Sequence, residues 1–291
     1  MIKIQEGCDQ ICAYCIVPKV RGRERSIPPE TLIREINRRT EEGFQEVVLT
    51  GTQLGTYGFD LPQVNLVSLL RRILAETAVP RIRVSSLQPQ EISAELLRLW
   101  EDSRLCPHFH VPLQSGSDSI LKSMRRRYDT AGFSQSVGLI REFIRDPGIT
   151  TDLIVGFPAE GEAEFRQSRD FASGIGFSDM HIFPYSRRHG TSAHHLDGQV
   201  DAADKRPRVN QMLEVASRTS QEFRRSQLGQ IRPVLWESCR ENGGTRTWSG
   251  LTDNYVRMYA VTHVSRSNLY NTITPARITA LDWSGVTGEA L

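Results

Sequence analysis

A chain of 291 residues, 38% of them hydrophobic, can build one large domain with a sizeable core and a second small one. Its formal net charge of +2 is too small to indicate nucleic-acid binding by itself. No apolar run approaches the ~20 residues that cross a bilayer. The first residues, MIKIQEGCDQ, lack the pattern of a signal peptide, so we expect no membrane partner and a cytoplasmic location.

Strand and helix patterns alternate six times in the first two hundred residues. Short apolar segments predict strands at 2–5, 46–50, 81–85, 108–112, 150–155 and 180–183. Apolar residues at helical spacing predict helices from Pro28–Pro29 to about Gly43 and at 66–74, 92–100, 137–144 and 162–171. This alternation predicts an α/β fold, a parallel sheet that curls into a partial (β/α)6 barrel.

The pattern changes after residue 200. Residues 201–228 are polar with one apolar side and predict a helical connector. From Gly229 onward, alternating segments at 233–236, 255–261 and 278–283 predict strands, with a tight turn at 242–244. We therefore expect a core over 1–200, a connector over 201–228 and a small antiparallel β-barrel over 229–291.

Polar loops, most of which contain glycine, follow each predicted strand of the core. They cover residues 7–26, 51–58, 85–89, 112–118, 156–160 and 185–191. In parallel barrels the loops at the carboxyl ends of the strands carry the active site. Their shared placement predicts an active site at this edge.

The first of these loops holds three of the five cysteines. Cys8, Cys12 and Cys15 follow the spacing C-x3-C-x2-C. Three thiolates this close can hold three irons of a cubane iron–sulfur cluster. The fourth iron then has no protein ligand and can bind a substrate.

Other interpretations of these cysteines remain open at this point. A zinc site needs a fourth ligand, which Cys106 or His108 could supply. A redox pair of Cys12 and Cys15 leaves Cys8 unexplained. A disulfide framework is disfavoured, because the cysteines are few and odd in number.

The cysteine spacing, with Tyr14 directly before the last cysteine, resembles the signature of the radical S-adenosylmethionine (SAM) superfamily. The resemblance implies a 4Fe–4S cluster on Cys8, Cys12 and Cys15, whose open iron binds SAM. One electron would then cleave SAM to methionine and a 5′-deoxyadenosyl radical. Tyr14 would face the adenine of SAM through its backbone.

Within that superfamily the chain resembles the methylthiotransferases over nearly its whole length. The segments that carry this likeness are VVLTGTQLGTYG (47–58), VSSLQPQEI (84–92), HVPLQSGSDSILKSMRRRY (110–128), TTDLIVGFP (150–158) and HIFPYSRRHGT (181–191). TGTQLGTYG and SSLQP are most similar to the branch that modifies N6-threonylcarbamoyladenosine beside the tRNA anticodon. The isopentenyladenosine and ribosomal-protein branches are the alternatives, and the family has an acid where this chain has Gln88.

Further cofactor contacts are expected in the loops and strands of the core. The resemblance implies that the loop with Gln114 and Ser115 contacts SAM, although such a loop can equally be a serine–glycine turn. Asp152 lies inside an apolar strand and should face a polar barrel interior, where it would position SAM or substrate. Backbone groups could also satisfy this aspartate. Gly156 allows the backbone close to adenine or ends the strand.

RNA contacts are expected at two places. Arg125 and Arg127 lie near a predicted rim loop, where arginines suit phosphates, although a solvated charged face is the alternative. The segment WSGLTDNYVRMY (248–259) resembles a TRAM domain, with Arg246, Tyr255 and Arg257 as its RNA contacts. We read the three histidines at 189, 194 and 195 as polar loop residues, and Cys106 and Cys239 as buried thiols.

The resemblance also implies a part that this sequence does not contain. Methylthiotransferases carry an additional N-terminal domain with three more cysteines, which ligate a second cluster, whereas this chain begins about where the radical SAM domain begins. A truncated or late start, a partner chain that carries the domain, or loss of sulfur insertion would explain this.

The expected function is that of a radical SAM enzyme that methylthiolates tRNA, with tRNA and an electron donor as partners. The alternatives are a non-catalytic tRNA-binding fragment or subunit and a radical SAM enzyme with a different substrate.

Overall fold

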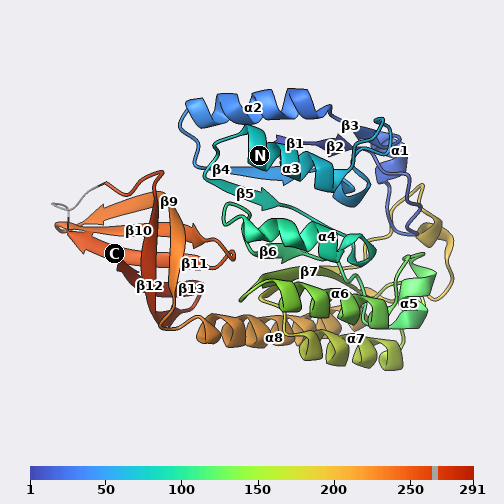
Figure 1. The fold of residues 1–291 in the computed structure, drawn as a ribbon. Helices are drawn as coiled ribbons and strands as arrows, with labels where there is room; N and C mark the ends of the chain where they lie inside the picture. Colours follow the sequence, from blue (N-terminus) through green and yellow to red (C-terminus); the bar gives the residue numbers. More distant parts are fainter. Residues whose placement is uncertain (264–267) are drawn as a thin grey trace.

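The computed structural model describes residues 1–263 and 268–291. Six parallel strands form a curved layer with helices on its outer side (Figure 1). The strands are β1 (Ile2–Lys3), β4 (Glu46–Thr50), β5 (Arg81–Val84), β6 (His108–His110), β7 (Gly148–Val155) and β8 (Asp179–Pro184). They form two three-stranded sheets, β1-β4-β5 and β6-β7-β8, which parallel bridges at Ile82–Leu105 and Ser86–His110 connect. The predicted α/β fold, a partial (β/α)6 barrel, is confirmed.

The helices on the outer side are α2 (Pro29–Glu41), α3 (Leu66–Glu76), α4 (Ala94–Leu97), α6 (Thr130–Phe143) and α7 (Glu162–Ile175). Each turns an apolar face toward the sheet, as Leu32, Ile33 and Ile36 of α2 illustrate. Two short helices, α1 (Val17–Arg21) and α5 (Asp118–Ser123), and the two-residue pair β2 (Gln5–Glu6) and β3 (Arg25–Ser26) were not predicted.

Side chains alternate along the strands between the helical side and the inner face. In β7, Thr151, Leu153 and Val155 are buried, whereas Asp152 and Ile154 on the opposite side are only partly buried. Polar groups therefore collect on the inner face, and the apolar core lies between the sheet and the helices.

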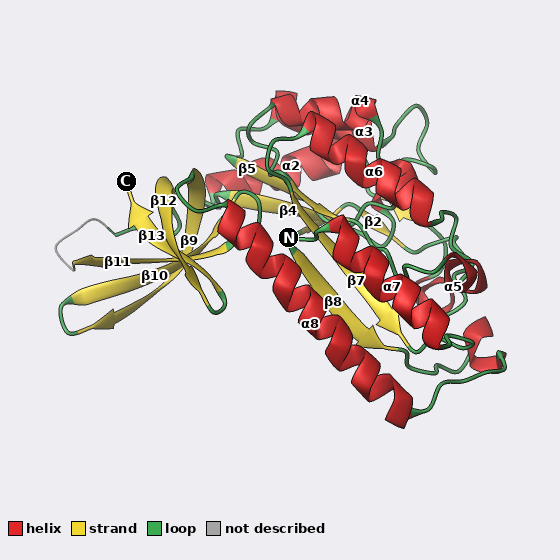
Figure 2. Cartoon of the chain, turned by 90° about the horizontal axis from the view of Figure 1, so that it is seen from below, coloured by secondary structure: helices red, strands yellow, loops and turns green. Residues whose placement is uncertain are grey.

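The chain then forms a long helix and a closed barrel. Helix α8 (Ala202–Ser226) runs beside β8 toward the barrel (Figure 2). The barrel strands are β9 (Ile231–Asn242), β10 (Thr245–Thr252), β11 (Arg257–His263), β12 (Ile273–Asp282) and β13 (Gly285–Ala290). Trp236 and Trp248 fill its interior, and Gly243 and Gly244 form the predicted tight turn with positive φ. The small barrel is present as predicted, but β10 and β13 were not predicted as strands, and one pairing, β11 with β13, is parallel.

A loop of the barrel covers the amino ends of the parallel strands. Arg81 donates hydrogen bonds to the carbonyls of Leu251 and Thr252, both at 3.2 Å. Tyr255 stacks on His108 with ring centroids 4.3 Å apart. The barrel thus occupies the end of the sheet opposite to the cysteine loop. No helix in the described ranges is long and apolar enough to cross a membrane.

Candidate active site at the carboxyl ends of the parallel strands

The cysteine loop, residues 7–26, is held at the carboxyl edge by backbone hydrogen bonds from several segments. The Ala13 amide donates to the Met124 carbonyl after α5 at 2.9 Å, and the Ala193 amide after β8 donates to the Ala13 carbonyl at 2.8 Å. Gly7 adopts a φ of +78°, and a Cβ there would lie 1.9 Å from the Arg23 carbonyl oxygen. The loop therefore has a fixed path at the carboxyl edge of the sheet.

All three cysteines of this loop are free thiols; Cys8 is buried, and Cys12 and Cys15 are partly buried. The pKa of Cys8 is raised to about 11, chiefly by burial and also by the charges of Glu24, Cys12 and Cys15, although the hydrogen bond from the Gln10 amide opposes the rise. Burial also raises the pKa of Cys15. Both shifts oppose thiolate formation at neutral pH, and a metal bound to these sulfurs would favour it.

Two of the cysteines line a cavity. Cys12 and Cys15 border a space of about 380 Å³ together with Arg125 and His195. The site therefore offers both sulfur ligands and room beside them.

Arg126 brings a positive charge against the cysteines. Its Nη1 donates to Cys12 Sγ at 3.2 Å and to the Tyr14 hydroxyl at 3.3 Å, and its Nε donates to the Tyr128 hydroxyl at 3.0 Å. Gln88 Oε1 accepts from the same guanidinium. Among the described residues no carboxylate forms an ion pair with Arg126, so its charge is left for the cysteine site.

The remaining cysteines supply no fourth ligand. Cys106 is buried at the amino end of the sheet, with its Sγ 3.8 Å from Glu46 Oε2. His108 lies at the same end beneath Tyr255. Cys239 is exposed on the barrel, so the prediction that it is buried is wrong, because its side chain points out of β9. The zinc alternative based on Cys106 or His108 is therefore excluded.

The residues predicted to contact SAM come from the cysteine loop and from the loops after β6 and β7. Tyr14 packs edge-on against Phe157 at 6.5 Å beside the cysteines. Gln114 has a φ of +65°, and its loop turns Ser115 inward, where Ser115 Oγ accepts from the Ser117 amide at 3.2 Å. Gly156 also has a positive φ, and a Cβ there would meet Lys205 of α8 at 2.4 Å. Local packing accounts for the conformations of the Gln114–Ser115 loop and of Gly156. Contact of these residues with SAM stays a prediction.

Asp152 faces the inner side of the sheet, as predicted, together with two histidines that sequence reasoning missed. Its Oδ1 lies 3.0 Å from His181 Nδ1, and its Oδ2 lies 3.3 Å from His110 Nε2. Burial alone would raise the pKa of Asp152, but the two imidazoles outweigh it and hold the pKa below its usual value. The parallel register that aligns these strands gives no signal in a single sequence.

The predicted RNA contacts lie on both ends of the molecule. Arg125 and Arg127 are exposed, and Arg125 borders the cavity beside Cys12 and Cys15. Arg246 pairs with Glu241 and Arg257 with Glu237 on the barrel surface. Tyr255 stacks on His108, and the Arg83 guanidinium carbon lies 4.8 Å from the centroid of its ring.

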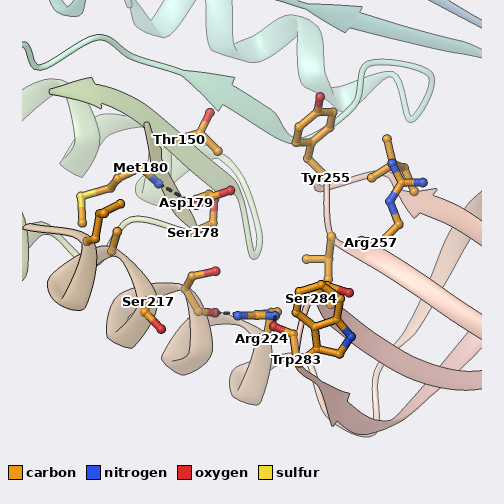
Figure 3. A pocket seen from close by; sticks show the side chains of 16 residues that line it. Thr150, Ser178, Asp179, Met180, Ser217, Arg224, Tyr255, Arg257, Trp283 and Ser284 are labelled. Carbon is orange, nitrogen blue, oxygen red and sulfur yellow. Dashed lines mark hydrogen bonds between the residues drawn. The ribbon is translucent and has the colours of Figure 1, made fainter. Parts of the chain in front are cut away.

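A second cavity, of about 450 Å³, lies where α8 meets the barrel (Figure 3). Arg224, Arg257 and Trp283 border it, and Trp283 is 91% exposed. It lies by the barrel, away from the cysteines, and Tyr255 points from its border toward the parallel sheet.

The fold and the site define a partial (β/α)6 barrel with a three-cysteine loop at its carboxyl edge. The chain belongs to the radical SAM superfamily, whose family model matches residues 2–172. Membership of this superfamily implies a 4Fe–4S cluster and SAM as cofactors. The three thiols, with the Arg126 guanidinium beside Cys12, fit an anionic sulfur-ligated cluster.

Similar proteins support this assignment. The threonylcarbamoyladenosine tRNA methylthiotransferase MtaB of Bacillus subtilis is 35% identical over 260 residues, which cover 88% of this chain and 58% of that protein. A tRNA-2-methylthio-N(6)-dimethylallyladenosine synthase of Syntrophotalea carbinolica is 32% identical over 99% of this chain and 65% of its own length. The chain thus spans about 58% to 65% of these relatives.

The fold is also similar to a solved structure. The radical SAM methyltransferase TsrM of Kitasatospora setae, solved with cobalamin and a [4Fe-4S] cluster, superposes with a TM-score of 0.52 at 17% identity. The match covers 63% of this chain and 36% of that one.

Proposed function

We propose that this chain is the radical SAM part of a tRNA methylthiotransferase that acts on N6-threonylcarbamoyladenosine beside the anticodon. The observation that carries the proposal is the cysteine loop, with Arg126 against it, in a chain whose similar proteins are tRNA methylthiotransferases. When bound, the cluster would supply the electron that cleaves SAM to a carbon radical.

The residues around the cysteines have separate roles in this proposal. Cys8, Cys12 and Cys15 hold the cluster, and Arg126 pairs with the SAM carboxylate through its free charge. Tyr14 and Phe157 pack against one another and shape the apolar wall beside the cofactor. Gln114 and Gly156 hold the loops after β6 and β7 that border it.

An RNA partner is supported by the surface of the molecule. Arg125 borders the cavity beside the cysteines, and both Arg125 and Arg127 are exposed, so that they can contact phosphates. Trp283 is an exposed aromatic on which a base can stack, and Arg224 and Arg257 border the same cavity. The C-terminal barrel would then act as an RNA-binding domain of the TRAM type, with Arg246 and Tyr255 among its RNA contacts.

A second candidate is the isopentenyladenosine branch. A synthase of that class is similar to this chain at 32% identity, close to the 35% of the threonylcarbamoyladenosine enzyme. The two branches share the radical chemistry and differ in the group on N6 of the target adenosine. The N-terminal domain, the electron donor and a cytoplasmic location belong to the proposal as well.

Nucleoside mass spectrometry tests the proposal. The chain is expressed in a bacterial host that lacks both methylthiotransferases, alone and together with the N-terminal domain of a relative. Methylthiolated N6-threonylcarbamoyladenosine is expected in the tRNA, and Cys12→Ser should abolish it while Cys239→Ser leaves it unchanged. A methylthio group on isopentenyladenosine alone would favour the second candidate, and unmodified tRNA with both partners present would contradict both.

A further inference from the structure

A polar group lies on the inner face of the sheet, apart from the cysteine loop. Asp152 of β7 pairs in register with His181 of β8, and His110 of β6 lies on the other side of Asp152. The two carboxylate–imidazole separations are 3.0 and 3.3 Å. Three adjacent strands thus bring two imidazoles and a carboxylate together on the inner face of the sheet.

An exposed aromatic lies in the next layer toward the cysteines. Phe183 follows His181 by two residues, so both point to the same side of β8, and their ring centroids are 6.5 Å apart. Met180 and Ile182 point the other way, into the core. Phe183 is 50% exposed and pairs in register with Ile154, which packs in one cluster with Tyr14 and Phe157. A flat apolar ring is therefore free between the polar group and the cysteine loop.

Hydrogen bonds fix which nitrogen of His181 is available. Because Nδ1 donates to the Asp152 carboxylate, the neutral ring keeps its lone pair on Nε2. His110 is anchored in turn, since its Nδ1 lies 3.0 Å from Thr150 Oγ1, which also lies 3.0 Å from His108 Nε2. The chain of contacts holds Asp152 and His181 in one arrangement before any ligand binds.

We propose that Phe183 and the Asp152–His181 pair bind the target base of the RNA, which stacks on Phe183 and donates an exocyclic N–H to His181 Nε2. This inference rests on the proposed function and names the residues that would read its substrate. Adenine carries such an N–H at N6 and keeps one when N6 bears a single substituent. Guanine and hypoxanthine carry a carbonyl oxygen there, which His181 Nε2 would repel. Bases acted on by enzymes are read in this way, by stacking and by their polar edges.

The same three side chains also have the composition of a two-histidine, one-carboxylate metal site. Their ligand atoms all lie within 4.8 Å of one another. The arrangement favours a base instead, because both carboxylate oxygens already contact imidazoles. The exposed ring of Phe183 also offers a base a surface to stack on, whereas it offers a metal ion no ligand. Metal binding is an outcome that the test separates.

The experiment uses the full chain with its cluster reconstituted and two synthetic anticodon stem-loops, which differ only by adenosine or inosine at the target position. Fluorescence anisotropy gives the dissociation constant of each.

The wild-type protein should prefer adenosine by about tenfold, the effect of one hydrogen bond and its lost partner. His181→Ala and Asp152→Asn should bring the ratio close to one. Phe183→Ala should weaken both RNAs by about tenfold or more and keep the ratio. Phe143→Ala, a surface phenylalanine on α6, is the matched control and should change neither.

Several results would overturn the inference. It is wrong if His181→Ala keeps the full preference while its iron content and circular dichroism match the wild type. It is also wrong if the wild-type protein carries a transition metal beyond the cluster iron that Asp152→Asn loses. If these variants bind both stem-loops as the wild type does and the tRNA is still methylthiolated in cells, this inference fails but the proposed function stands. If the wild type neither binds nor modifies tRNA, the proposed function itself fails.

Discussion

Arg126 is the side chain that distinguishes the cysteine site from a simple thiol cluster. It stands in a run of three arginines, and its two neighbours are exposed whereas it turns inward to Cys12. Arg125 takes a φ of 58° at the end of α5, and this left-handed residue redirects the chain. The sequence offers three equivalent arginines, and only the local backbone decides which of them reaches the site.

Replacing Arg126 with Gln should weaken SAM binding by about tenfold to a hundredfold. A charge-assisted hydrogen bond contributes about 1.5–3 kcal/mol, and the glutamine keeps polarity but loses the charge. Equilibrium dialysis of SAM against the reconstituted protein measures the change. Arg127→Gln is the matched control and should bind SAM normally. An unchanged affinity for Arg126→Gln, at normal iron content, would refute the assigned role.

Glu91 gives the fold a dependence on pH. Burial raises its pKa to about 7, and hydrogen bonds from Gln88 and Gln53 only partly oppose this. Because the pKa of Glu91 in the folded protein lies above the usual value of 4.5 for a glutamate, the stabilisation is fully present below about pH 4.5 and is lost as the pH rises to about 7.

The protein should therefore lose up to about 3 kcal/mol of unfolding free energy from this group between pH 4.5 and 7, at 1.36 kcal/mol per pKa unit. Urea unfolding of the wild type and of Glu91→Gln across this range measures the difference. The curves should diverge as the pH rises, with the variant gaining relative to the wild type. Parallel curves would show that Glu91 ionises normally.

The six parallel strands could be predicted because each is a short apolar run followed by a polar loop. The short helices α1 and α5 have five and six residues and give no helical period, so they were missed. Strands β10 and β13 were missed as separate strands because glycine, threonine and serine dilute their alternation. The grouping of Asp152 with His110 and His181 depends on the register of three strands that are distant in sequence.

The contact between the barrel loop and the sheet is the element-scale feature most open to a test. Tyr255 is 47% exposed, yet one face stacks on His108 and Arg83 lies over its ring. Tyr255→Ala should destabilise the protein by about 2 kcal/mol, from a lost aromatic pair, a cation–π contact and partial burial. Chemical denaturation checks the value, and Tyr270→Ala, an exposed tyrosine, should cost little. If Tyr255→Ala weakened RNA binding with no loss of stability, the tyrosine would act as an RNA contact and would not stabilise the contact between the barrel loop and the sheet.

At the scale of the whole molecule, two separate ends carry the expected activities. The cysteine loop lies at the carboxyl ends of the strands, and the barrel lies at their amino ends (Figure 1). Helix α8, with 25 residues, is about 37 Å long and connects them. An RNA that contacts Trp283 and also enters the site must therefore lie along the length of the sheet.

The central claim is that three sulfurs of one loop hold a cluster whose remaining iron accepts SAM. The direct measurement is 5′-deoxyadenosine, quantified by mass spectrometry after the anaerobically reconstituted chain is given SAM and dithionite. The account predicts about four irons per chain and steady release of 5′-deoxyadenosine, with neither in Cys12→Ser and both in Cys239→Ser. A wild-type protein that binds no iron, or a Cys12→Ser variant that cleaves SAM as well as the wild type, would contradict it.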